Sequence, residues 1–78
     1  YLLVLRCRNE EAEQAAAAAL AGQVKRSAVK SKTVTDAGIE LTLEVALSSE
    51  ATSFVNALNS IEGVESASLV SYNGDYTA

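Results

Sequence analysis

The chain has 78 residues, of which 49% are hydrophobic and 21% charged, and its formal net charge is −4. This composition is too apolar for intrinsic disorder, and the length fits one domain that buries roughly 60% of its unfolded surface. A single cysteine and the absence of histidine exclude an internal disulfide and leave too few ligands for a zinc-type cluster. We therefore expect one folded domain from a reducing compartment.

The first segment predicts a strand followed by a helix. Residues 1–7, YLLVLRC, are mostly apolar and predict a central strand. Asn9 can cap a helix over residues 10–23, which begins with two glutamates, consists of strong helix formers and stops near Gly22. The expected core stripe of this helix is Ala12, Ala15 or Ala16, Ala19 and Leu20.

The middle of the chain predicts two strands joined by a short turn. Residues 24–36 combine Val and Thr with several lysines, which is typical of an edge strand because charge discourages pairing with another chain. A turn over 36–38 leads to residues 39–47, where apolar and polar residues alternate with period two. This alternation predicts a strand with one buried face and one wet face. The expected inward residues are Ile39, Leu41, Leu43, Val45 and Leu47.

The last third predicts a helix, a strand and a turn. Ser48 or Ser49 can cap the helix, and Gly63 ends it. Residues 64–72 predict a strand of weaker alternation. Asn73 and Gly74 then form a tight turn, so that residues 73–78 either form a short hairpin or fray. The apolar residues at helical spacing are Phe54, Val55, Leu58 and Ile61.

The order strand, helix, strand, strand, helix, strand matches the ferredoxin-like βαββαβ motif, an α+β fold. Right-handed crossovers give an antiparallel sheet with the spatial order 4-1-3-2, strands numbered along the chain, and two helices on one face. The domain is expected to span residues 1–72, with 73–78 as its tail. Hydrophobicity agrees, because the most apolar strands occupy the centre of this sheet.

The open sheet face and the lysine-rich edge are the places where we look for function. All six basic residues lie in positions 1–32 with three acidic ones, a net charge of +3, whereas positions 33–78 hold seven acidic residues and no basic one, a net charge of −7. The edge can therefore attract an acidic partner, although a solvated edge that resists aggregation is the simpler interpretation. The expected open-face residues are Glu40, Thr42, Glu44, Leu2, Val4, Arg6 and lysines of residues 24–36.

Specific chemistries are excluded in turn. The open face has carboxylates where RNA-binding sheets have aromatic residues, so we expect no nucleic-acid partner. Cys7 stands alone in RCRNEE, where a metal chaperone needs two cysteines, and is expected to pack as a small apolar residue. Glu40 and Glu44 lie roughly 13 Å apart along a strand, too far to share a proton. We expect no enzyme, no catalytic residue, no cofactor-binding residue and no metal site.

Membrane insertion of this segment is not expected. No run of about 18 apolar residues is present, and no signal peptide is recognisable. The alanine run Ala15 to Ala19 lets a helix lie close to a sheet, and its outer surface can contact another subunit. Because the chain starts with Tyr1 and contains no methionine, it is interpreted as a piece of a longer protein.

The opening YLLVLRC, the segment GIELTLEVAL and the ending NSIEGVESASLVSYNGDY resemble the C-terminal soluble domain of a family of uncharacterised bacterial multi-pass membrane proteins, a domain-of-unknown-function family often encoded near polyphosphate polymerases. The pattern is also similar to the ACT-like cytoplasmic domain that ends the MgtC family. The resemblance implies a cytoplasmic regulatory or scaffolding module, tethered to the inner membrane through N-terminal segments missing here. It assigns no active-site residue.

Two functions remain open at this point. The first is a non-enzymatic accessory domain that contacts the remainder of its parent membrane protein or forms a homodimer through the sheet face or an edge strand. The alternative is an ACT-type sensor of a small molecule, an amino acid or a nucleotide, near the loop after the first strand. Amino-acid-binding ACT domains usually place a glycine at the start of the first helix, where this chain has Asn9 and Glu10.

Overall fold

A computed structural model describes residues 1–47 and 52–71 of the chain. Its elements follow the expected order, and each lies within a segment that the sequence predicts as the same type, except that β3 begins one residue early, at Gly38, which was predicted to belong to the turn. They are β1 (Leu2–Cys7), α1 (Glu10–Ala21), β2 (Arg26–Thr35), β3 (Gly38–Ala46), α2 (Ser53–Asn59) and β4 (Val64–Val70).

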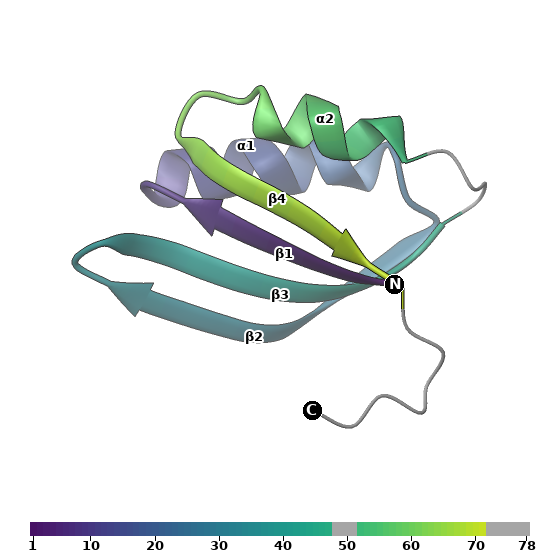
Figure 1. The fold of residues 1–78 in the computed structure, drawn as a ribbon, viewed down its shortest axis with the longest axis horizontal. Helices are drawn as coiled ribbons and strands as arrows, with labels where there is room; N and C mark the ends of the chain where they lie inside the picture. Colours follow the sequence, from purple (N-terminus) through teal and green to yellow (C-terminus); the bar gives the residue numbers. More distant parts are fainter. Residues whose placement is uncertain (48–51, 72–78) are drawn as a thin grey trace.

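The strands form one sheet in the order β2-β3-β1-β4, and every neighbouring pair is antiparallel. This is the predicted order read from the opposite edge, so the predicted α+β class, sheet order and edge position of β2 are confirmed. Figure 1 shows both helices on the same side of the sheet, while the hairpin of β2 and β3 reaches away from them. The edge strand β2 therefore lies farthest from the helical layer.

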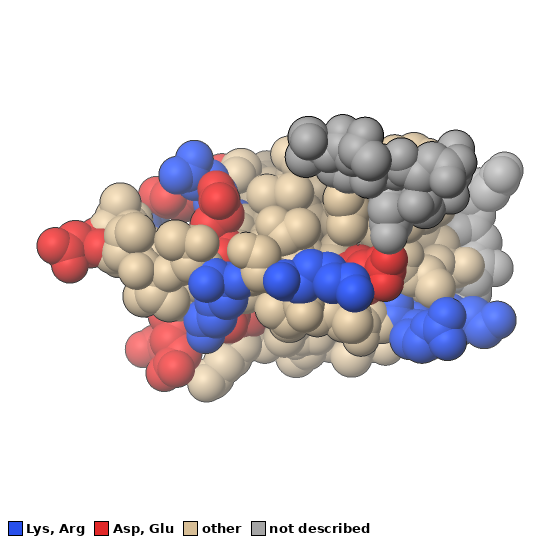
Figure 2. All heavy atoms as spheres, turned by 90° about the horizontal axis from the view of Figure 1, so that it is seen from below, with Lys and Arg blue, Asp and Glu red and all other residues tan. Residues whose placement is uncertain are grey.

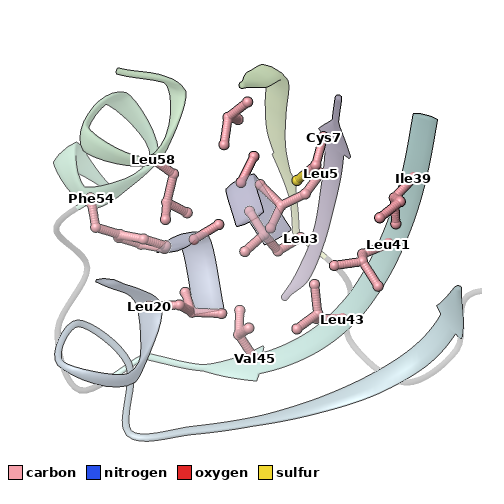
Figure 3. Close-up of a cluster of buried hydrophobic side chains, with 13 residues drawn as sticks. Leu3, Leu5, Cys7, Leu20, Ile39, Leu41, Leu43, Val45, Phe54 and Leu58 are labelled. Carbon is pink, nitrogen blue, oxygen red and sulfur yellow. The ribbon is translucent and has the colours of Figure 1, made fainter. Parts of the chain in front are cut away.

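The core lies between the helices and one face of the sheet (Figure 3). Alternate residues of β1 and β3 point into it, which gives the burial pattern that the period-two alternation predicts. Leu3 and Leu5 of β1 are fully enclosed, and Phe54 and Leu58 of α2 close the core from above. The remaining buried residues are Cys7, Ala12, Ala16, Leu20, Ile39, Leu41, Leu43, Val45 and Val64.

Helix α1 buries a narrower stripe than the sequence indicated. Ala12, Ala16 and Leu20 are buried, whereas Ala15 and Ala19 are exposed. The predicted burial of Ala19 and the alternative choice of Ala15 are therefore wrong. Residues four apart on a helix share one face, so the large side chain of Leu20 sets which alanines face the sheet.

Several element ends also differ from the predictions. Helix α1 stops at Ala21, not Gln23, because Gln23 and Val24 both donate their backbone N–H groups to the Leu20 carbonyl in a tightened last turn. Helix α2 ends at Asn59, so Ile61 packs on the core from a turn. The predicted caps Ser48 and Ser49, the predicted strand end Tyr72 and the predicted tail over residues 73–78 lie outside the described residues.

Candidate functional site

The β1–α1 loop is held in place by its own polar groups. The Asn9 side-chain oxygen accepts a hydrogen bond of 2.9 Å from the Ala12 backbone N–H, so the predicted cap is confirmed. The Arg8 N–H donates to the Gly63 carbonyl at 2.6 Å, which joins this loop to the one after α2. A hollow of about 340 Å³ lies beside both loops, and Arg8, Glu11 and Glu62 contribute charges of both signs to its lining.

The interior holds no polar side chain that could act on a bound molecule. Every buried side chain in residues 1–47 and 52–71 belongs to an apolar residue or to Cys7, and no group of histidine, cysteine and carboxylate side chains there is suited to hold a metal ion. Burial raises the pKa of the Cys7 thiol above its ordinary value, and the negative charge of Glu13 raises it further. A protonated, enclosed thiol is a poor nucleophile.

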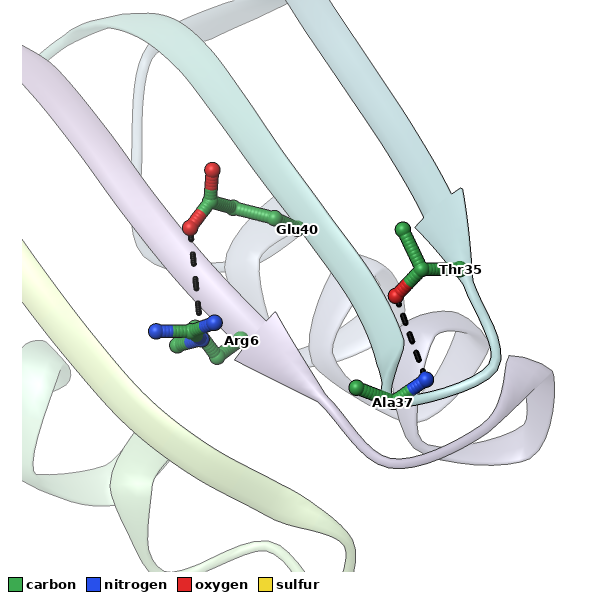
Figure 4. A network of polar contacts seen from close by, with 4 residues as sticks. All are labelled: Arg6, Thr35, Ala37 and Glu40. Carbon is green, nitrogen blue, oxygen red and sulfur yellow. Dashed lines mark hydrogen bonds and ion pairs between the residues drawn. The ribbon is translucent and has the colours of Figure 1, made fainter.

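The open face of the sheet carries ion pairs between neighbouring strands. Arg6 of β1 stands directly opposite Glu40 of β3, with Arg6 Nε 3.9 Å from Glu40 Oε2 (Figure 4). Lys30 of β2 pairs with Glu44, at 3.7 Å between Lys30 Nζ and Glu44 Oε1. The two carboxylates predicted to be too far apart to share a proton are thus each matched with a different cation. These exposed pairs contribute a few tenths of a kcal/mol each.

A small hollow of about 100 Å³ lies at the far end of the open face, beside the β2–β3 turn. Arg6, Glu40 and Thr35 contribute to its lining, and the Thr35 hydroxyl accepts a hydrogen bond from the Ala37 N–H at 3.1 Å (Figure 4). Arg6, Glu40 and Glu65 give this lining charges of both signs.

Strand β2 differs from every other strand in being exposed along its entire length. All ten of its residues are exposed, including Val29 at 59% and Val34 at 64%. Both valines stand opposite core residues of β3, Leu43 and Ile39, and therefore lie on the helix side of the sheet. The helices do not extend far enough over the sheet to cover these two valines. The apolar side of the sheet therefore includes an exposed part at β2.

The basic residues predicted for this edge lie along it. Figure 2 looks at the molecule from the β2 side and shows Lys and Arg side chains in a row, with acidic side chains gathered mainly at one end. Lys32 Nζ lies 3.0 Å from Glu13 Oε2 of α1, and Lys30 pairs with Glu44. Lys25 and Arg26 have no carboxylate within 4.0 Å in the described part of the chain.

Sequence reasoning missed two features of this surface. It treated Val29 and Val34 as ordinary strand formers and gave no sign that they are exposed. The register of β2 against β3 also shifts between Val29 and Ser31, where Lys30 is the extra residue of a bulge. Neither feature has a local sequence signal, because exposure depends on the reach of α1 and a bulge depends on the partner strand.

No helix in the described segments is long and apolar enough to cross a membrane. Comparisons with protein-family models, with curated proteins and with solved structures find no match to this chain. The fold and its surfaces define a small α+β domain with an antiparallel sheet, one helical layer and an uncovered basic edge strand.

Proposed function

We propose that this chain is a non-enzymatic accessory domain that acts through protein–protein contacts, with a ferredoxin-like, ACT-like fold. In this proposal it is the cytoplasmic regulatory module of a bacterial membrane protein and contacts the remainder of that protein or a second copy of itself. The observation that carries the proposal is strand β2, which is exposed over ten residues and pairs with β3 along one edge.

The energetics of an edge strand support this proposal. A long strand with an unpaired row of backbone N–H and C=O groups can pair with another chain. The lysines of β2 oppose pairing with a strand of like charge, but they do not oppose pairing with an acidic one. Two exposed valines on this strand add apolar area that a partner could bury at roughly 25 cal/mol per Å². Acidic and basic side chains around the edge would set specificity and the association rate.

Site-directed cross-linking tests the proposal. A photoreactive side chain is placed at Thr33, exposed on β2, and in a matched control at Gln14, exposed on α1. Both variants are expressed in the cells that make the protein, and cross-linked polypeptides are identified by mass spectrometry. We expect one identified protein, or a second copy of this chain, at Thr33 and not at Gln14. Equal labelling at the two positions, or none at either, would overturn the proposal.

Small-molecule sensing is the second candidate, and the hollow of about 340 Å³ at the β1–α1 loop is the observation that favours it. The Asn9 side chain already caps helix α1, so it stands where a ligand would have to approach the backbone of this loop. A thermal-shift screen with amino acids and nucleotides discriminates the two functions. A ligand at 100 times its dissociation constant should add about 2.7 kcal/mol to the free energy of unfolding.

A further inference from the structure

The helical layer covers the two edge strands of the sheet to different degrees. Helix α2 packs against the edge strand β4, whose Val64 is buried and whose Ala67 and Leu69 pack against the core. No residue of β2 is buried or half-buried, and in the described structure its outer edge has no strand beside it. In an antiparallel sheet, alternate residues of an edge strand direct their N–H and C=O groups outward. Strand β2 is thus the edge strand whose residues are all uncovered, and its outward backbone groups can accept an additional strand.

An added strand would also cover the exposed apolar side chains. Val29 and Val34 lie on the helix side of β2, and cross-strand neighbours stand about 4.5–5.5 Å apart between Cβ atoms. Apolar side chains at alternate positions of an incoming strand would therefore contact both valines. The same pairing would satisfy the outward backbone groups, so affinity would come from two sources.

The charge of β2 indicates which strand this would be. Arg26, Lys30 and Lys32 are its only charged residues, and Lys25 precedes it. Pairing β2 with β2 of a second copy would bring the cations of both copies into one ladder, and facing like charges destabilise a sheet. Lys25 and Arg26, which have no carboxylate within 4.0 Å in the described residues, instead favour glutamates or aspartates from a partner.

We propose that β2 is an acceptor edge for an acidic, extended segment of another polypeptide, which adds to the sheet as a strand beside β2. This inference rests on the proposed function in protein contact and deepens it by naming the partner's chemistry. Backbone pairing would supply affinity, and contacts with Val29 and Val34 would fix the register. Lys25 and Arg26, at the start of the strand, would select acidic sequences.

The probe is a blocked peptide of about ten residues in which Glu alternates with Val or Thr, matching the length of β2. It is titrated into the purified chain while backbone amide signals and amide exchange are followed by NMR. We expect alternate β2 amides to exchange at least about tenfold more slowly when bound, with β4 amides unchanged. Raising the salt from about 0.05 M to about 0.5 M should weaken binding, because the Debye length shortens.

Two control peptides separate the sources of affinity. Replacing each Glu by Lys removes charge complementarity and should weaken binding at least about tenfold. Placing Pro at the centre removes a ladder donor and should weaken binding at least about tenfold if the backbone pairs. On the protein, Arg26→Gln should weaken binding about threefold. The matched variant Arg8→Gln, at an exposed position outside the sheet, should change it by less than about 1.5-fold.

Three results would overturn this inference: equal binding of the Glu and Lys peptides, protection of amides outside β2, or protection of β2 in a concentration-dependent dimer without peptide. The last result would assign the edge to a second copy of the chain. Cross-linking at Thr33 is independent of this titration. If a protein is cross-linked at Thr33 but the acidic peptide does not bind, only the inference that the partner adds an acidic strand is refuted. If the peptide binds but nothing is cross-linked in cells, only the proposed function is refuted.

Discussion

Gly63 and Ala12 approach so closely that a β-carbon added to Gly63 would lie 2.7 Å from the β-carbon of Ala12. The contact brings the turn after α2 onto the first turn of α1. The Arg8 N–H donates to the Gly63 carbonyl in the same place, so two loops far apart in the sequence lock together. The candidate small-molecule hollow borders this contact, and its shape therefore depends on Gly63.

Substituting Gly63 tests the importance of this contact. Gly63 has a φ of +93°, which L-residues rarely adopt, and Gly63→Ala adds a steric clash as well. We expect a loss of about 1–3 kcal/mol in the free energy of unfolding, measured by urea denaturation. Gly22→Ala is the matched control, because its φ is −89° and its added β-carbon would be 4.0 Å from the nearest atom. It should change stability by less than about 1 kcal/mol. Equal losses in both variants would contradict the specific contact.

The Asn9 cap gives the second prediction. Asn9→Ala removes the oxygen that accepts the Ala12 N–H and should cost about 1 kcal/mol. Asn9→Ser keeps an acceptor at the cap and should retain most of the stability. Urea denaturation of the three proteins measures both effects. A serine variant as unstable as the alanine variant would show that Asn9 contributes something other than the cap.

The sequence was most informative where side chains differ sharply along an element. In β3 the alternation from Ile39 to Val45 predicted both the strand and its buried face, because a strand places successive residues on opposite sides. The lysines of β2 predicted an edge. The family resemblance and the function inferred from the sequence have no support from the comparisons with known proteins, so both remain proposals. The candidate surface itself was predicted only in part, because its basic residues can be read from the sequence and its exposed valines cannot.

The alanine run shows why the rest could not be predicted. Neighbouring alanines have identical hydrophobicity, so the pattern within residues 15–19 gives no rotational phase. Only the spacing of four from Leu20 to Ala16 and Ala12 defines the buried stripe. The bulge at Lys30 and the uncovered valines depend on how distant segments meet, which no local pattern encodes.

The buried stripe of α1 can be tested by enlarging one alanine at a time. Ala16 is fully enclosed, so Ala16→Leu forces extra volume against the sheet and should cost about 1–3 kcal/mol. Ala15→Leu occupies an exposed position on the same helix and should change stability by less than about 0.5 kcal/mol. Urea denaturation and NMR spectra of both variants check the difference. If Ala15→Leu destabilised the protein more than Ala16→Leu, the face of α1 that carries Ala15 would lie against the core, which would contradict the structure.

The buried thiol of Cys7 predicts a pH dependence of stability. Because its pKa is raised in the folded chain, chiefly by burial and secondarily by Glu13, the unfolded chain loses this proton at lower pH than the folded chain. The stabilisation is complete below the thiol's ordinary pKa and falls as the pH rises through the raised folded pKa. Stability of the wild type should therefore decrease in that alkaline range.

Comparison with Cys7→Ala isolates the thiol from the titration of lysines and tyrosines. The variant should be less stable at neutral pH because it loses buried sulfur, and its alkaline loss should be smaller. Parallel pH profiles for the two proteins, measured by urea denaturation, would contradict a titrating buried thiol.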